Sequence, residues 1–393
     1  MKSPNAVLYI CHDPEIGGSF LSLCNLIHSL AGRVSPVVLL RRRSEMSEAL
    51  EAMGCRVLVH EFKLNVANAN PLFRTCTLPF RRLRDAWANA RCIAWVARRL
   101  RDVRVDIVHA NSSVISFGGA LAARLGAKHV WHIREIYDLG LRRQPVEGWA
   151  AFRRSLSGAD ALVAISQAVY DRWDMRKHGM ARIIPDAVRP TSEIAFDPSK
   201  EKCVLFCATV LDDSKGADLA AEIFCRSGLH ADGFRLRYVG TCPPACQAKL
   251  EGIAARHGQD GALEFLGRRK DVRPFMAKAA AFLMCSRFEG LGRVTVEAMF
   301  YGCLVLGLDS GGTREIIENG RNGLLFAGTD EAAAKLRQLA PDRTLVRRLA
   351  AAAAETARER FSEEAYGTKI LALYRDLLET RPPLASPTAG NGR

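Results

Sequence analysis

No stretch of this sequence is apolar over the ~18–20 residues that a helix needs to cross a bilayer. The N-terminus carries Lys2 and then a short apolar run at 6–10 that Cys11 and His12 interrupt, which predicts a first buried strand and not a signal peptide. With 48% hydrophobic and 25% charged residues, the composition is typical of a folded globular protein. We therefore expect a cytoplasmic protein whose contact with a membrane, at the inner face, is at most peripheral.

Complete metal-ligand patterns are also lacking among the twelve cysteines. The pairs Cys203 with Cys207 and Cys242 with Cys246 each resemble half of a zinc site, yet no second pair follows at zinc-ligand spacing. Many cysteines lie inside strand-like runs, which favours reduced, buried thiols over disulfides. We expect neither a metal ion nor a bound cofactor.

Acidic residues are too few to balance the basic ones, and the formal net charge is +14. Fifteen lysines and arginines face six acidic residues between positions 33 and 104, chiefly in the clusters 41–43, 81–84 and 98–101. Such a segment attracts nucleic acid, anionic lipid headgroups or phosphorylated substrates, or is simply a solvated basic face. Zinc-finger ligands, basic strands interleaved with aromatic residues and an obvious reader helix are missing, so we expect no nucleic acid partner.

Strand-like and helix-like segments alternate along the 393 residues, which predicts an α/β protein with parallel sheets. One series of strands runs from 7–10 to 182–184, and a second series from 204–208 to 324–326. The stretch 185–198 between them has prolines and no periodicity, as in a linker. A final helix at 362–378 carries an apolar stripe at helical spacing, made of Tyr366, Ile370, Leu373 and Leu377.

Two Rossmann-like domains are the simplest architecture for this pattern, because the chain is too long for one ordinary core. Ligands of such sheets bind at the carboxyl ends of the strands, so the cleft between the domains is the expected site. The expected segments are an N-terminal domain at 1–188, a linker at 189–200, a C-terminal domain at 201–360, a returning helix at 361–380 and a disordered tail at 381–393.

Two loops could bring an anion to a helix N-terminus. Gly17 and Gly18 follow the first strand, although Ser19 as a helix N-cap explains them almost as well. The dinucleotide fingerprint Gly-x-Gly-x-x-Gly is missing, which disfavours NAD or FAD. Lys215 and Gly216 open a helix in the second half. A lysine there opposes the helix dipole unless an anion lies nearby, and the alternative is an exposed loop lysine.

The most informative segment places Glu289 and Glu297 on either side of a glycine-rich turn at 290–292. A second turn into a helix follows at 310–315, with the sequence Ser-Gly-Gly-Thr-Arg-Glu. Two carboxylates can form the acid/base pair of a glycosidase. Here one is in a loop and the other near the second turn of the next helix, so contacts to a polar ligand fit better.

These motifs resemble those of the retaining glycosyltransferases of family GT4, also called group 1, which have the GT-B fold of two Rossmann-like domains facing across a cleft. The matching features are the Glu-x7-Glu motif, the following Gly-Gly-x-x-Glu turn, the Lys-Gly loop, residues 106–109 and the terminal helix. The resemblance covers nearly the whole chain and is strongest at 206–326. It implies a retaining, metal-independent glycosyltransferase with an acceptor domain followed by a donor domain.

The resemblance also implies roles for the residues of the Glu-x7-Glu motif. Glu297 is expected to accept hydrogen bonds from the ribose hydroxyls of a nucleotide-sugar, most simply a UDP- or GDP-sugar. The side chain of Glu289 and the backbone of Gly290, Leu291 and Gly292 are expected to hold the hydroxyls of the transferred sugar.

Four further residues receive roles from the same resemblance. Lys215 is expected to pair with the diphosphate and to stabilise the departing nucleotide. Gly17 and Gly18 are expected to let the N-terminal domain approach the diphosphate. His132 falls at a strand end where the family places residues near the transferred sugar, and a histidine packed in the cleft wall is the alternative.

Three positions depart from the family's pattern. An arginine that often precedes the Lys-Gly pair is missing, and Arg268, Arg269 or Arg293 are candidates to replace its charge. The departures are Thr209-Val210-Leu211 in place of the arginine, Asp186-Ala187 in place of Asn-Gly, and Cys303-Leu304 in place of a proline after Gly302.

The basic N-terminal segment leaves several acceptors open. The helix expected at 81–100, with Trp87 and Trp95 among arginines, could rest on an anionic membrane and receive a lipid-linked saccharide, as in bacterial surface polysaccharide assembly. Alternatively it packs a face of Leu83, Trp87, Ala90, Ala94 and Ala97 on the sheet. A GT-B epimerase, a catalytically weak homologue and, more distantly, a basic nucleic-acid-binding protein remain alternatives.

Overall fold

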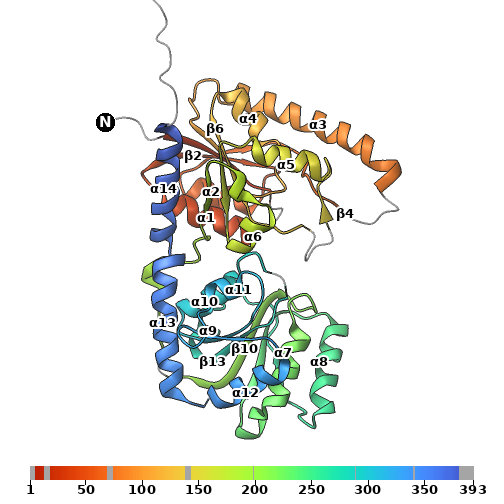
Figure 1. Ribbon diagram of the computed structural model, residues 1–393, viewed down its shortest axis with the longest axis vertical. Coiled ribbons are helices and arrows are strands. Elements are labelled where there is room, and N and C mark those ends of the chain that lie inside the picture. Colours follow the sequence, from red (N-terminus) through yellow and green to blue (C-terminus); the bar gives the residue numbers. More distant parts are fainter. Residues whose placement is uncertain are drawn as a thin grey trace, which may run out of the picture.

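The computed structural model describes residues 5–12, 18–68, 74–137, 143–197, 199–287, 289–339 and 341–379. These ranges form two parallel sheets, each covered by helices on both faces (Figure 1). Their strands are almost continuously apolar, because a parallel sheet between two helical layers is buried on both faces. The α/β class and the two Rossmann-like domains expected from the sequence are confirmed.

The first sheet has the strand order β3-β2-β1-β5-β6-β8-β9. Its strands are β1 (Asn5–Ile10), β2 (Val34–Leu40), β3 (Arg56–Val59), β5 (Ile107–Ala110), β6 (Lys128–Ile133), β8 (Ala161–Ala164) and β9 (Ala181–Ile183). Two further short strands, β4 (Ala67–Asn68) and β7 (Arg143–Gln144), pair antiparallel outside the sheet. The helices of this half are α1 (Gly18–Ser29), α2 (Glu45–Ala52), α3 (Arg74–Arg99), α4 (Gly118–Leu125), α5 (Trp149–Ser157) and α6 (Gln167–Arg172).

The second sheet has the order β12-β11-β10-β13-β14-β15. Its strands are β10 (Glu201–Val210), β11 (Arg235–Thr241), β12 (Leu263–Phe265), β13 (Ala279–Met284), β14 (Leu304–Leu308) and β15 (Leu324–Phe326). Its helices are α7 (Ala217–Ser227), α8 (Pro244–Arg256), α9 (Arg273–Lys278), α10 (Arg293–Phe300), α11 (Thr313–Ile316) and α12 (Thr329–Leu339). The strand order reverses between β10 and β13, as it does between β1 and β5 in the first sheet. The loops that leave those four strands therefore flank the two crevices in which sheets of this kind bind ligands.

The chain crosses between the domains twice, at adjacent points. Helix α13 (Arg343–Phe361) lies along the second domain, and α14 (Glu363–Glu379) lies along the first (Figure 1). At the crossing, the amide of Val188 donates to the carbonyl of Phe361 over 2.9 Å, and the amide of Glu363 donates to the carbonyl of Arg189 over 3.1 Å. The linker and the return of the chain are thus joined by backbone hydrogen bonds.

The apolar stripe expected on the last helix is buried against the first domain. Tyr366, Ile370, Leu373 and Leu377 share one hydrophobic cluster with β1 and with α1 residues such as Phe20. Among the helices of the described ranges, none is both long enough and apolar enough to cross a membrane.

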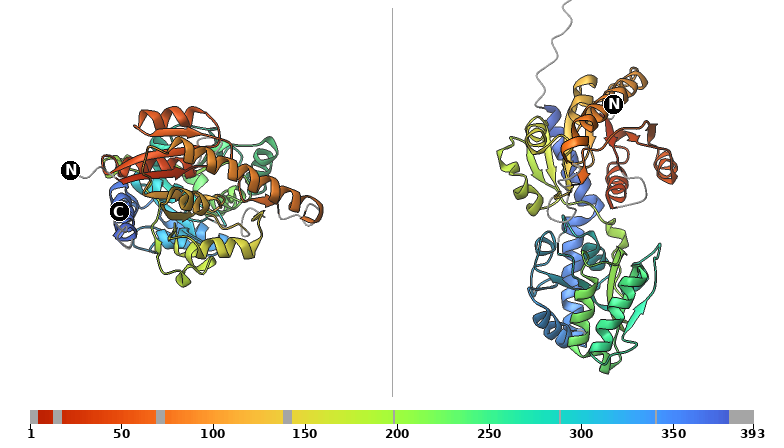
Figure 2. Two further views of the ribbon diagram at one scale, coloured as in Figure 1. Left: turned by 90° about the horizontal axis from the view of Figure 1, so that it is seen from above. Right: turned by 90° about the vertical axis from the view of Figure 1, so that its right-hand side faces the viewer.

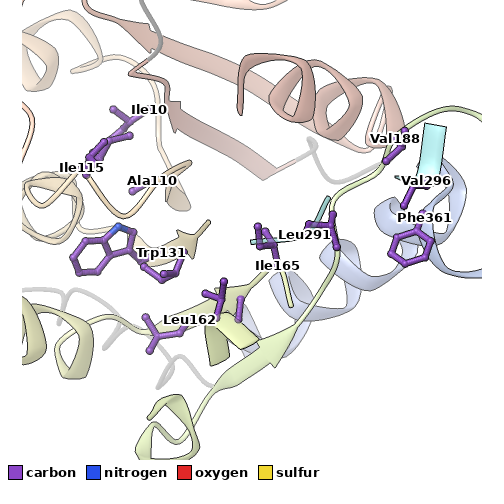
Figure 3. Close-up of a cluster of buried hydrophobic side chains, with 14 of the residues drawn as sticks. Ile10, Ala110, Ile115, Trp131, Leu162, Ile165, Val188, Leu291, Val296 and Phe361 are labelled. Atoms are coloured by element: carbon purple, nitrogen blue, oxygen red, sulfur yellow. The ribbon is translucent and has the colours of Figure 1, made fainter. Parts of the chain in front are cut away.

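A single hydrophobic cluster also extends across the junction of the two domains. It joins Trp131 and Ile165 of the first domain to Leu291 and Val296 of the second (Figure 3). Phe361, at the end of α13, belongs to the same cluster. The wall of the candidate site therefore rests on a packed core.

Candidate functional site

The loop after β10 is folded by Asp212. Its carboxylate accepts the Lys215 amide over 2.9 Å and the Ser214 hydroxyl over 2.6 Å, a local turn that shapes the start of α7. Gly216 follows with φ +73°, and a Cβ there would lie 2.3 Å from the carbonyl oxygen of Cys285. Only glycine fits this conformation and this approach to the end of β13.

Lys215 and Glu289 meet where the loops after β10 and β13 come together. The Lys215 Nζ lies 2.8 Å from Glu289 Oε1, and the two side chains are 42% and 20% exposed. Sequence reasoning placed both residues in the donor site, and the structure brings them into direct contact. The ion pair is accessible to solvent and lies at a strand-order reversal. An anionic ligand could therefore replace Glu289 as the partner of Lys215.

The glycine-rich turn after Glu289 packs against the second glycine turn. The Gly312 amide donates to the Glu289 carbonyl over 3.0 Å, and a Cβ on Gly312 would lie 2.6 Å from the Leu291 carbonyl oxygen. Gly292, at φ +88°, is the N-cap of α10. The Glu-x7-Glu turn and the Gly-Gly-x-x-Glu turn therefore pack backbone against backbone.

Glu297 lies on α10, one residue beyond its first turn, and is half-buried. Its charge contributes to raising the pKa of Cys207, behind burial and the Cys303 thiol, and acts on Arg293. Within the described ranges, its carboxylate has no hydrogen bond or ion pair. Its oxygens are therefore available to accept from a ligand, whereas Glu289 is engaged with Lys215.

The first domain approaches the glycine turn closely. A Cβ on Gly290 would lie 2.7 Å from the carbonyl oxygen of Arg134 and 3.2 Å from the Ile165 side chain. Gly18 begins α1, and its Cβ position is 4.0 Å from the side chain of Arg293. Gly17 lies outside the described residues. The structure thus brings Gly18 and Gly290 to the boundary between the domains.

Arg293 crosses that boundary from the first residue of α10. Its Nη1 donates to the Ser22 hydroxyl and to the Ala187 carbonyl, both over 2.8 Å. Burial lowers the pKa of Arg293. Of the three arginines considered for the missing charge, Arg268 and Arg269 lie exposed after β12, whereas Arg293 is beside Gly18.

A second contact crosses the boundary from the Gly-Gly-x-x-Glu motif. The Glu315 carboxylate accepts the backbone amides of Gln167 and Ala168, at 2.6 and 2.7 Å, and so caps α6 of the first domain. Burial raises the pKa of Glu315, and the two amide donors oppose that shift. Sequence reasoning recognised the motif that contains Glu315 and missed this contact, which no local pattern reveals.

Asp186, one of the departures from the family pattern, has a buried partner. Its Oδ2 accepts from Arg134 Nη1 and, over 2.9 Å, from the Ser22 hydroxyl. The side chains of Asp186 and Arg134 are each 5% exposed. Arg134 also donates to Asn111, from Nε to its carbonyl and from Nη2 to its side-chain oxygen. The unusual aspartate thus balances a buried arginine.

His132 is completely buried within this polar cluster and does not line an open wall. Its Nδ1 lies 3.3 Å from both Arg134 Nη2 and His109 Nε2. Because arginine can only donate, Nδ1 is an acceptor, and a neutral His132 carries its proton on Nε2, 3.7 Å from Asp186 Oδ1. The expected position near the transferred sugar stays a prediction, since the adjacent strand end, and not this side chain, meets Gly290.

The tautomer of His109 follows from the same argument. His109 donates from Nε2 to His132, so its Nδ1 accepts the Tyr374 hydroxyl over 2.6 Å. Burial lowers the pKa of His109 to about 3 and that of His132 well below its usual range, with the Arg134 charge adding to both shifts. Both rings are neutral at pH 7, and a hydrogen-bonded chain runs from α14 to the strand end beside the glycine turn.

The other departures leave no structural defect. Cys303 is buried, and its thiol donates to the Ala279 carbonyl over 3.6 Å. Thr209 and Val210, in place of the family's arginine, end β10 with exposed side chains.

Two family models match the two domains of this chain. The family model described as "Glycosyltransferase Family 4" matches residues 41–191, and "Glycosyl transferases group 1" matches residues 201–342. The lipopolysaccharide core biosynthesis glycosyltransferase LpsE of Rhizobium meliloti is 35% identical over 34% of this chain, and the match spans 38% of LpsE. A PP-undecaprenol-linked saccharide N-acetyl-D-galactosaminyltransferase of Campylobacter jejuni is 26% identical over 54% of this chain and 58% of its own length. The matches thus span less than two thirds of these relatives.

Solved structures show the same fold over nearly the whole chain. HepE of Anabaena, solved with UDP, has a TM-score of 0.75 at 20% identity, covering 94% of this chain and 100% of HepE. A glycosyltransferase of Rickettsia africae has a TM-score of 0.75 at 16% identity, covering 96% and 100%. The motifs, the two domains and both family models lead to one conclusion. This chain belongs to the group 1 glycosyltransferases of family GT4 and has the GT-B fold.

Proposed function

We propose that this protein transfers a sugar from a nucleotide-sugar to a saccharide or lipid-linked saccharide in the assembly of bacterial surface polysaccharide. The contact between Lys215 and Glu289 carries the proposal, because it lies where the loops after β10 and β13 meet. Sheets with this strand order bind their ligands at that crevice. The Lys215 ammonium could pair with a diphosphate, and the Glu289 carboxylate could accept hydroxyl groups of a sugar. The two groups are in contact with each other at this crevice.

The proposed donor is a UDP- or GDP-sugar. Support comes from HepE, which was solved with UDP-glucose and, separately, with UDP and glucose. In this chain, the carboxylate oxygens of Glu297 can accept two ribose hydroxyls. Glu289 and the backbone of Gly290, Leu291 and Gly292 would hold the sugar, and Gly17 and Gly18 would lie beside the diphosphate.

The proposed reaction is metal-independent and retains the anomeric configuration. The bond between the sugar C1 and the diphosphate oxygen breaks, and a bond from C1 to the acceptor oxygen forms on the same face. The acceptor proton passes to the departing diphosphate, so no covalent enzyme intermediate is needed. Lys215 stabilises the charge that develops on the diphosphate, an effect of about 3 kcal/mol for one well-placed donor.

Nuclear magnetic resonance of the first product tests this reaction. A retaining transferase incubated with its α-linked nucleotide-sugar and water as a slow acceptor should release the α-sugar first. A β-sugar appearing first would overturn retention. A changed nucleotide-sugar without release of the nucleotide would instead identify an epimerase. Lys215→Ala should lower the rate by roughly 100-fold, whereas Lys249→Ala is the matched control, because Lys249 lies on α8 and pairs with the exposed Asp213 of the same loop.

The acceptor is proposed to be at a membrane surface because of α3. The three most exposed large apolar side chains of the described ranges are Phe80, Leu83 and Trp87, at 79%, 73% and 62%. They are separated by three and four positions and therefore share one helical face. The alternative, in which Leu83 and Trp87 pack on the sheet, is wrong, because the helical period turns Cys92, Val96 and Leu100 toward the sheet instead.

Figures 1 and 2 show the end of α3 nearest to β4 projecting beyond the rest of the first domain. Arg91 lies over the ring of Trp87, at 4.6 Å, and Arg84 is 63% exposed. An apolar face bordered by arginines suits the boundary between anionic headgroups and acyl chains. The Campylobacter relative, whose name includes PP-undecaprenol, agrees with an acceptor at such a surface.

Vesicle co-sedimentation tests the membrane proposal. Vesicles containing phosphatidylglycerol should bind the protein at low salt, and pure phosphatidylcholine vesicles should bind it much less. Replacing Phe80, Leu83 and Trp87 together by serine should abolish binding, whereas Met53→Ser, at a 36% exposed position outside α3, should not. Equal binding by the triple variant would overturn the assignment of this face.

A further inference from the structure

A pocket of about 320 Å³ lies on the second domain, on the side away from the candidate donor site. Its lining includes Glu201, at the beginning of β10, and Ala280, near the beginning of β13. Lys215 and Glu289 follow the other ends of the same two strands. The pocket is thus separated from the donor site by the length of the sheet, and its volume is within the range of small-molecule sites.

The floor of the pocket is apolar. Phe234 and Val346 are buried, whereas Phe196 keeps 42% of its surface exposed. The Phe196 ring is nevertheless fixed, because it packs on Gly302, where a Cβ would lie 2.5 Å from the ring. The adjacent Ala195 amide donates to the Phe300 carbonyl over 3.0 Å. A large, fixed and half-exposed ring is a suitable surface for a flat apolar group.

The walls of the pocket carry more positive than negative charge. Lys200, Lys202, Arg343 and Arg347 line it, against Glu201 and Asp232. The Glu201 carboxylate is engaged with Arg237 and Lys278, neither of which lines the pocket. Among the lining residues, the charge of the four basic side chains is thus opposed mainly by the exposed Asp232, and Asp197, outside the lining, also acts on Lys200.

The two lysines are held by neutral groups. Lys202 Nζ donates to the Asp232 carbonyl over 2.8 Å, and Lys200 Nζ donates to the Ala277 carbonyl. Lys200 also lies 5.4 Å from the centre of the Phe196 ring. Burial lowers the pKa of Lys200, although the charge of the Asp197 carboxylate opposes that shift. Each ammonium retains N–H donors for a ligand.

Arg343 and Arg347 stand one turn apart at the beginning of α13. Like charges at this spacing repel each other, and Arg343, in the first turn, also opposes the positive end of the helix dipole. The Asp342 carboxylate is occupied in capping the helix through the amides of Thr344 and Leu345. In the described part of the chain, neither guanidinium has a hydrogen bond or an ion pair. A bound dianion would relieve both unfavourable effects.

We propose that this pocket binds a phosphate monoester with a compact apolar body, separately from the donor site. The phosphate would contact Arg343, Arg347 and the lysines, and the apolar body would rest on Phe196. Phenyl phosphate is the matched probe, with inorganic phosphate and phenol as its charged and apolar halves.

Isothermal titration calorimetry of the full chain at low salt tests this proposal. Phenyl phosphate should bind saturably, more tightly than either half, and saturating UDP should not displace it. Arg347→Ala and Phe196→Ala should each weaken binding about tenfold, the loss expected for one charge-assisted hydrogen bond or one ring contact. Arg348→Ala is the matched control, because it removes the same charge from the next residue, outside the pocket lining.

Each alternative result would overturn the proposal. Inorganic phosphate binding as tightly as phenyl phosphate would show that the apolar floor is unused. If Arg347→Ala and Arg348→Ala weakened binding of phenyl phosphate equally, the loss would come from the net charge of the protein and not from a contact in the pocket. Displacement by UDP would place the probe in the donor site, and failure to saturate would remove the pocket as a site.

Discussion

Asp186 shows how a single residue that departs from a family pattern can be required by its surroundings. The family usually has asparagine at this position, and here the side chain is an aspartate that pairs with Arg134 inside the protein. Both side chains are 5% exposed, so the guanidinium has little water to neutralise its field. The departure is accounted for by charge balance between two strand ends that are distant in sequence.

We therefore expect Asp186→Asn to destabilise the protein although it restores the family's usual residue. Removing one partner of a buried ion pair costs about 3–5 kcal/mol, because the other charge stays buried and uncompensated. Asp376→Asn is the matched control, since the Asp376 pair with Arg182 is surface-exposed and worth at most about 1 kcal/mol. Urea unfolding measures both changes, and an Asp186→Asn variant as stable as the wild type would contradict this account.

At the scale of elements, α14 depends on a close approach to α1. Gly367 lies where a Cβ would be 2.7 Å from the carbonyl oxygen of Ser29. Alanine is a better helix former than glycine by about 1 kcal/mol, but forcing a methyl group against rigid backbone costs about 1–3 kcal/mol. The steric cost is the larger effect because the obstacle is a main-chain oxygen.

Gly367→Ala should therefore lower the free energy of unfolding by up to about 2 kcal/mol, the difference of these two effects. Gly252→Ala, on α8 with open space around its Cβ position, should raise it. Both variants are compared by chemical denaturation. If Gly367→Ala were as stabilising as Gly252→Ala, α14 would not be packed on α1 as described.

The hydrogen-bonded chain between β5, β6 and α14 gives stability a pH dependence. Burial lowers the pKa of His109 to about 3 and places that of His132 well below 6.5. Each histidine binds a proton more readily in the unfolded protein than in the folded one. The free energy of unfolding therefore falls as the pH drops below about 6.5. The expected slope is about 1.4 kcal/mol per pH unit for each histidine that is fully protonated only in the unfolded state.

Unfolding free energies measured between pH 7 and 5 test that slope. The His109→Gln variant should lose less stability over this interval than the wild type does, whatever its stability at pH 7. A variant with the same slope as the wild type would show that His109 is protonated in the folded state.

The sequence predicts elements better than it predicts contacts between them. The strands and the Glu-x7-Glu turn were predictable because apolar runs and glycine spacing are local signals. Helix α3 begins at Arg74, earlier than the periodicity from 81 indicated, and six helices were not predicted: α2, α5, α8, α9, α12 and α13. The contacts of Arg293, Glu315 and His132 depend on residues more than a hundred positions away or on complete burial, which no local pattern encodes.

At the scale of the whole molecule, two side chains of the second domain hold the first. Arg293 donates to Ser22 and Ala187, and Glu315 caps α6. These contacts act together with the backbone bonds at Val188 and Glu363 and with the packing of α14. The two domains should consequently unfold as one cooperative unit.

Calorimetry tests that coupling. The wild type should show one transition, and Glu315→Ala should lower the unfolding temperature of the first domain and broaden or divide the transition, because the amides of Gln167 and Ala168 lose their acceptor and the domains lose a contact. Glu318→Ala, which removes only a local exposed pair with Arg321, is the control. Two separate transitions in the wild type would show that these contacts do not couple the domains.

The central claim is that the Lys215 and Glu289 pair and Glu297 together form the grip on a nucleotide-sugar. Thermal unfolding with UDP-, GDP- and ADP-sugars tests it most directly, since a ligand that binds only the folded state stabilises it by about 2.7 kcal/mol at 100 times its Kd. We predict that one of these donors raises the Tm of the wild type and of Glu359→Ala, an exposed control on α13, and that the rise is lost in Glu297→Ala. A Tm unchanged by every donor, or an equal rise in Glu297→Ala, would contradict the account.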